Sequence, residues 1–105
     1  MDDKYEVVIT KKCKISLNQI CGYIKNILDA EIASNNLLDK FEQLIKTLEV
    51  SPFIYQKVER YKILDKEYRK VVIKNYIVIY DVDEENKKVY LDNMFYGGSN
   101  YINKI

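Results

Sequence analysis

The sequence has no histidine and no tryptophan, and it holds only one proline, three glycines and two cysteines in 105 residues. The absence of histidine excludes zinc sites of the histidine type and any imidazole general base. An enzyme built from this chain would have to move protons with tyrosine, lysine or carboxylate groups. No apolar run approaches the roughly 20 residues that a membrane-spanning helix requires. The acidic start at residues 1–4 lacks the basic and apolar regions of a secretory signal, so we expect a cytoplasmic protein without a membrane partner.

The motifs that would indicate a metal or a cofactor are also missing. Cys13 and Cys21 do not have the spacing of a redox or zinc motif, and we expect them to be free thiols. The acidic residues 81–85 lack the spacing of a calcium-binding loop, and a hairpin tip explains them better. Gly97 and Gly98 are followed by too few residues for the helix that a phosphate-binding loop precedes. We therefore expect no metal ion and no cofactor.

Lysine and tyrosine, by contrast, are abundant. The net charge is only +1, but residues 57–74 hold seven basic and three acidic side chains. Such a stretch either attracts phosphate or an acidic protein, or is an ordinary solvated surface. The ten tyrosines can stack on unpaired bases, or they can fill half-buried positions beneath a binding partner. Tyr96 and Tyr101 flank a polar glycine loop, and we expect Tyr90 and Tyr96 to share one face of the last strand.

Hydrophobic spacing predicts a first strand over residues 5–9 and then two helices. A Ser-x-x-Gln capping box at Ser16 and Gln19 indicates where the first helix begins. Its predicted apolar stripe consists of Ile20, Tyr23, Ile24, Ile27 and Leu28. The second helix begins between residues 29 and 34, and it ends before Pro52. Its stripe consists of Leu37, Leu38, Phe41, Leu44, Ile45 and Leu48, and a short connection makes the pair an antiparallel hairpin.

After the proline the apolar period changes to two, which is typical of strands. Residues 70–74, 76–80 and 87–95 are predicted strands with short turns between them, and 58–63 is a weaker edge strand. Strands joined in this way form an antiparallel meander, whose apolar face would cover the helical hairpin. On this prediction Lys70 and Lys74 share a strand face. We expect a single domain over residues 1–105, with a two-layer α+β fold.

Three segments in this order resemble the RelE/ParE superfamily, the toxins of type II toxin–antitoxin systems. They read NLLDKF at 36–41, YRKVVIKNYIVIYDVDEE at 68–85, and VYLDNMFYGGSNY at 89–101. The resemblance covers essentially the whole chain. It implies a RelE-like fold, in which the first strand pairs beside the last, and a cognate antitoxin that wraps the toxin.

The resemblance also implies one of two activities. RelE-like members enter the ribosomal A site and cleave mRNA, by attack of a 2′-OH on the adjacent phosphate. ParE-like members inhibit DNA gyrase by binding and perform no chemistry. In the mRNA-cleaving members basic residues clamp the phosphate, but the matching positions here are Ile77, Asn93, Gly98 and Ser99. Each lost charge-assisted contact is worth about 1.5–3 kcal/mol, so strong cleavage is not expected.

The sequence therefore favours a toxin that binds its target, either gyrase or another protein, and that a cognate antitoxin neutralises. One alternative is a weak ribosome-dependent mRNA endonuclease. Its candidate residues, for catalysis or target binding, are Arg69, Lys70, Lys74, Tyr96 and Tyr101. Another alternative is a degenerate toxin that retains only antitoxin binding.

Overall fold

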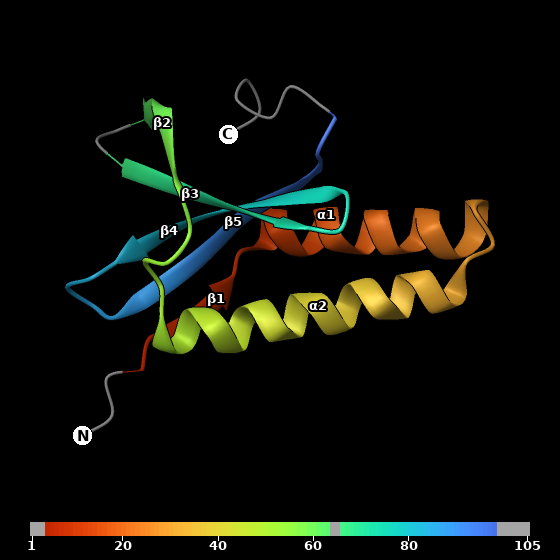
Figure 1. The fold of residues 1–105 in the computed structure, drawn as a ribbon, viewed down its shortest axis with the longest axis horizontal. Helices are drawn as coiled ribbons and strands as arrows, with labels where there is room; N and C mark the ends of the chain where they lie inside the picture. The colour runs from red at the N-terminus through yellow and green to blue at the C-terminus, as the bar shows by residue number, and fades with distance from the viewer. Residues whose placement is uncertain (1–3, 64–65, 99–105) are drawn as a thin grey trace.

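The computed structural model describes residues 4–63 and 66–98, with the backbone alone described for 59–63. Two helices, α1 (Lys11–Gly22) and α2 (Glu31–Val50), run antiparallel and form one layer; a π-helical turn, η1 (Tyr23–Ile27), extends α1. A five-stranded sheet forms the other layer (Figure 1). The strands are β1 (Glu6–Ile9), β2 (Lys57–Ile63), β3 (Lys66–Ile73), β4 (Tyr76–Asp83) and β5 (Lys88–Tyr96).

The sheet order is β1-β5-β4-β3-β2. Strands β2 to β5 form the predicted antiparallel meander, and β1 lies parallel to β5. The first strand therefore pairs beside the last, as the resemblance implied. The predicted α+β fold is confirmed.

The predicted start of the first helix is wrong. The helix begins at Lys11, and its N-cap is Thr10, whose Oγ1 accepts a hydrogen bond from the backbone N–H of Cys13 at 3.2 Å. The same hydroxyl donates to the carbonyl oxygen of Leu91 in β5 at 2.7 Å. Ser16 lies inside the helix and instead donates to Asn93 of β5 at 2.6 Å. The helix is therefore capped by Thr10 and not by Ser16, because groups of β5 accept hydrogen bonds from both hydroxyls.

Replacing Thr10 with alanine should lower the free energy of unfolding by about 1–2 kcal/mol, because both the cap and the bond to β5 are lost. Thr10→Ser keeps the hydroxyl and is the matched control, with most of the stability retained. Urea denaturation of the three proteins measures the difference. If Thr10→Ala were as stable as the wild type, the Thr10 cap would not be what fixes the start of the helix.

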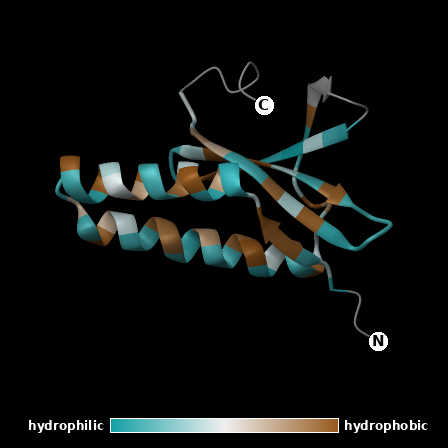
Figure 2. Ribbon diagram, turned by 180° about the vertical axis from the view of Figure 1, so that it is seen from behind, coloured by the Kyte–Doolittle hydropathy of each residue, from teal (hydrophilic) through white to brown (hydrophobic). Residues whose placement is uncertain are grey.

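The apolar stripe predicted for the first helix is right at Ile20 and Ile24, which pack against or within the core, and wrong at Tyr23, Ile27 and Leu28, which are exposed. Cys13 and Leu17 are the other buried side chains of this helix. A π-helical turn holds more residues per turn than an α-helix, so side chains beyond Ile24 rotate away from the position that α-helical spacing predicts. Several residues at the free end of the hairpin are hydrophobic by type (Figure 2), and Ile27, Leu28 and Ile32 there are exposed to solvent.

Helix α2 follows its predicted pattern except at Leu38, which is exposed. Leu37, Phe41, Leu44 and Leu48 are buried, and the helix ends at Val50, just before Pro52. These side chains pack against the helix-facing side of the sheet, in a core that includes Val71, Val78, Tyr80, Val89, Leu91 and Met94. The hairpin and the sheet thus share one main core.

Strand β5 contains an irregularity at Asp92. Ile79 pairs with Asn93, but the next residue, Tyr80, pairs with Leu91, so Asp92 has no partner across the ladder. An extra residue of this kind, a β-bulge, reverses the alternation of side chains beyond it. Tyr96 pairs with Tyr76 on the helix side, whereas Tyr90 pairs with Asp81 on the opposite side. The prediction that Tyr90 and Tyr96 share a face is therefore wrong.

Candidate functional site

The sheet surface opposite the helices, called here the far face, is built from three cross-strand rows. Strand register aligns one residue each from β3, β4 and β5 in every row. The rows are Tyr68, Asp81 and Tyr90; Lys70, Ile79 and Asn93; and Val72, Ile77 and Phe95. Two of the four positions where the resemblance places basic residues, Ile77 and Asn93, lie in these rows.

The third row is apolar throughout, and in the second row Ile79 lies buried between Lys70 and Asn93. Ile77 and Ile79 are buried and form a second small core with Val58, against which Tyr68 and Phe95 pack. Strand β4 is therefore buried on both of its faces. Lys70 is the one cation in the three rows, opposite Ile79. Apolar groups at these positions cannot hold a phosphate.

The side chain of Asn93 is used in hydrogen bonds within the protein. Its Oδ1 accepts hydrogen bonds from Ser16 Oγ at 2.6 Å and from the backbone N–H of Met94 at 2.8 Å. Asn93 is only 6% exposed, so its amide group joins α1 to β5 instead of facing a ligand. Of the four positions where the resemblance places basic residues, Ile77 and Asn93 are thus filled by buried groups, Gly98 lies in a turn, and Ser99 lies outside the described residues.

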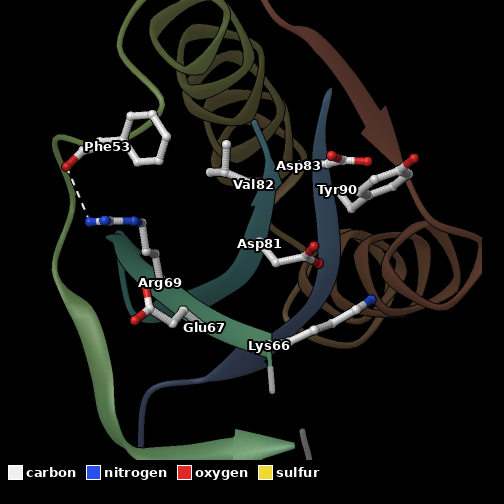
Figure 3. A pocket seen from close by; sticks show the side chains of 8 residues that line it. All are labelled: Phe53, Lys66, Glu67, Arg69, Asp81, Val82, Asp83 and Tyr90. Atoms are coloured by element: carbon white, nitrogen blue, oxygen red, sulfur yellow. Dashed lines mark hydrogen bonds between the residues drawn. The ribbon is translucent and has the colours of Figure 1, made fainter. Parts of the chain in front are cut away.

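Arg69 lies on the helix side of the sheet, opposite Tyr80. Its Nη1 donates to the carbonyl oxygens of Phe53 and Tyr55 at 3.1 and 2.7 Å, and its guanidinium lies 5.2 Å from the centre of the Phe53 ring (Figure 3). The buried hydroxyl of Tyr80 donates to the carbonyl oxygen of Pro52 at 2.9 Å. Together these groups attach the connection between α2 and β2 to the sheet.

The other predicted site residues are dispersed. Lys70 lies on the far face, whereas Lys74 lies in the β3–β4 turn with φ of 56°, so the prediction that these lysines share a strand face is wrong. Tyr96 lies on the helix side, with its ring 6.1 Å from that of Tyr76. Tyr101 lies outside the described residues. The described members of the set do not form one cluster.

A polar cavity of about 640 Å³ lies beside Arg69 (Figure 3). Lys66 and Arg69 are its cations, and Glu67, Asp81 and Asp83 contribute carboxyl groups, so the lining is not positive. Glu67 is engaged with Lys57 of β2 at 3.4 Å. Such a mixed lining does not suit a polyanion.

The prediction that Asp81 belongs to a hairpin tip is wrong, because Asp81 lies within β4; Asp92, at the bulge of β5, had no predicted role. Asp81 is 7% exposed, and its Oδ1 has no hydrogen-bond donor in the described structure; the same holds for Oδ2 of Asp92. Burial raises the pKa of Asp92 to about 8, and the hydrogen bond to Asp81 and its charge add to the rise. The signal available in the sequence was an aspartate inside the apolar run of β4, where a charge is costly.

An apolar surface lies at the free end of the hairpin. The residues of this hairpin patch are Tyr23, Ile27, Leu28 and Ile32, each between 52% and 78% exposed. Beside the patch, a cavity of about 260 Å³ separates the hairpin from the β3–β4 turn; its lining includes Ile24, Leu28, Ala33, Leu37 and Tyr76. Clustered apolar exposure of this kind marks an interaction surface.

The described residues contain no group of three cysteine, aspartate or glutamate side chains placed to hold a metal ion. Within the same part of the chain, no helix is both long and apolar enough to cross a membrane.

Comparison with known proteins gives both a family and a fold. The model of the family described as ParE toxin of type II toxin-antitoxin system, parDE, matches residues 7–92. A chain of the chromosomal ParDE TA system from P. aeruginosa has a TM-score of 0.68 and 10% identity, covering 90% of this chain and 97% of that one. The comparison with curated proteins returned no match.

Two further solved structures share the fold. A chain of the archaeal RelE–RelB complex from Pyrococcus horikoshii OT3 has a TM-score of 0.58 and 18% identity, over 90% of this chain and 97% of that one. A chain of the toxin–antitoxin complex RelBE2 from Mycobacterium tuberculosis has a TM-score of 0.58 and 16% identity, over 89% and 91%.

Proposed function

Because this chain belongs to the ParE toxin family of type II toxin–antitoxin systems, we propose that it arrests growth by binding a target such as DNA gyrase, without cleaving RNA. A toxin that acts by binding needs a shaped surface, whereas one that cleaves RNA needs cations around the scissile phosphate and groups that transfer protons.

The observation that carries this proposal is the composition of the far face. Where a phosphate clamp would lie, the sheet carries the buried apolar pair Ile77 and Ile79 and the internally bonded Asn93. Lys70 is the single cation of the three rows. One cation in these rows and no histidine would leave most of the transition-state charge uncompensated, and the next cation of β3, Lys66, lies near the carboxyl group of Asp92.

We propose further that a cognate antitoxin docks its apolar side chains on the hairpin patch. Three of the similar structures come from toxin–antitoxin systems or complexes. In this chain the patch and the adjoining cavity offer exposed apolar groups in a concave setting, which suits the apolar stripe of an amphipathic helix. Lys74 at the rim of the cavity would favour acidic residues beside that stripe.

The proposal is tested by inducing the protein in a bacterium that lacks the antitoxin. We expect growth arrest, an intact ribosome-bound reporter mRNA in primer extension, and inhibition of supercoiling by purified gyrase in vitro. Lys70→Ala is the informative variant, because Arg69→Ala would confound activity with folding. Codon-phased cuts that disappear in Lys70→Ala would establish a ribonuclease and overturn the proposal. Absence of arrest would indicate a degenerate toxin that retains only antitoxin binding.

A further inference from the structure

The bulge in β5 brings two acidic side chains together beneath the far face. Asp92 is the unpaired residue of the bulge, and Asp81 is the residue of β4 that lies between Tyr68 and Tyr90 in the first cross-strand row. The carboxyl group of Asp81 lies close enough to that of Asp92 for a hydrogen bond between them to raise the pKa of Asp92. Asp81 Oδ1 and Asp92 Oδ2 are buried, and neither meets an N–H or O–H donor in the described structure.

Cations near the pair do not neutralise it. Lys66 from β3 and Lys12 from α1 lie close enough to attract the charge of Asp92, yet neither is within ion-pair distance of its carboxylate. The remaining titratable neighbours are Cys13 of α1, Tyr68 of β3 and Tyr90 of β5. Around the outer side of Asp81 lie Glu67, Arg69 and Asp83. No surrounding group therefore supplies the proton or the ion pair that two buried carboxylates need.

We propose that Asp81 and Asp92 share a single proton in the folded protein, and that this proton closes the β4–β5 bulge. Two carboxyl groups can hydrogen-bond to each other only if one of them is protonated. With both ionised, two like charges would lie side by side in a poorly solvated position, which is the arrangement that forces one proton to stay. When the proton is lost, repulsion between the two carboxylates should destabilise the bulge and the adjacent first row of the far face.

The direction of the pH effect follows from the pKa of Asp92. Burial first, then the hydrogen bond to Asp81 and its charge, raise this pKa from 3.8 to about 8, while Lys66 and Lys12 oppose the rise. A folded-state pKa above the unfolded value means that the stabilisation is complete below pH 3.8 and is lost as pH rises through about 8. The titration of Asp92 should therefore raise the unfolding equilibrium constant about ten-fold between pH 7 and pH 9.

Urea denaturation of the wild type, Asp92→Asn and Asp83→Asn between pH 6 and pH 9.5 tests the proposal. The amide of Asp92→Asn can donate to Asp81 without titrating, so its unfolding constant should rise only about two-fold from pH 7 to 9, which is the share contributed by the raised pKa of Cys13. Asp83 lies at the neighbouring turn, where hydrogen bonds from Asn86 lower its pKa. Asp83→Asn should therefore keep the alkaline loss of the wild type and serves as the matched control.

A second measurement does not depend on a variant that folds. Carboxyl ¹³C resonances of the wild type, followed by NMR from pH 3 to 10, should show one step near pH 8 for the pair. A step near pH 8 together with an alkaline loss of stability supports the shared proton. If both carboxyl groups titrate below pH 5 and stability is flat from pH 7 to 9, the proposal is wrong.

Discussion

Replacing Arg69 with alanine should lower the free energy of unfolding by about 2–4 kcal/mol. The guanidinium donates to two carbonyl oxygens of the connection between α2 and β2 and stacks on Phe53. Alanine removes both hydrogen bonds and leaves the carbonyl oxygen of Tyr55 to be solvated by opening of the connection. Chemical denaturation measures the loss, and increased proteolysis within residues 51–56 would locate it.

Two variants give this prediction its controls. Arg69→Lys keeps the charge but has no planar fork, so it should recover only part of the stability. Lys74→Ala removes a lysine from an exposed turn and should change stability by less than about 0.5 kcal/mol. An Arg69→Ala protein as stable as the wild type would show that other contacts hold the connection. If the Arg69→Ala protein still arrests growth at a low temperature at which it is folded, Arg69 acts on stability and is not needed for binding the target.

Introducing two aspartates into the hairpin patch, at Ile27 and Leu28, should weaken antitoxin binding by at least about a hundred-fold. Each of these exposed apolar side chains is expected to contribute about 1.5–3 kcal/mol when a partner buries it, and each aspartate would add a desolvation cost. The variant should fold normally, because both side chains are largely exposed. Titration calorimetry with the cognate antitoxin measures the affinity.

The matched control is Val50→Asp, which changes an equally exposed apolar residue, 62% accessible, at the other end of α2. Its antitoxin affinity should remain within about two-fold of the wild type. In cells the double variant should stay toxic when the antitoxin is coexpressed, whereas Val50→Asp should be neutralised. An unchanged affinity of the double variant would place the antitoxin on another surface.

Much of the fold could be predicted from local patterns. Helix α2, its end before Pro52, the β3–β4 turn and the meander are all regular elements in which burial follows a fixed period. The first helix was predicted less well because its cap and its register depend on distant partners. Thr10 is the cap because the carbonyl oxygen of Leu91 in β5 accepts a hydrogen bond from its hydroxyl. The π-helical turn η1 rotates Ile27 and Leu28 away from the core.

The sequence alone determined that no imidazole can take part in the chemistry of this chain, and it determined the order of the elements. The absence of histidine and the change from helical to strand period are properties of the chain itself. The tertiary structure decided which side chains meet. Arg69 binds the connection between α2 and β2, and Tyr90 and Tyr96 lie on opposite faces of the sheet. Asp81 lies near Asp92. A periodic pattern records only which neighbours along the chain face the same way, whereas a bulge or a cross-strand contact joins residues whose spacing in the sequence carries no such record.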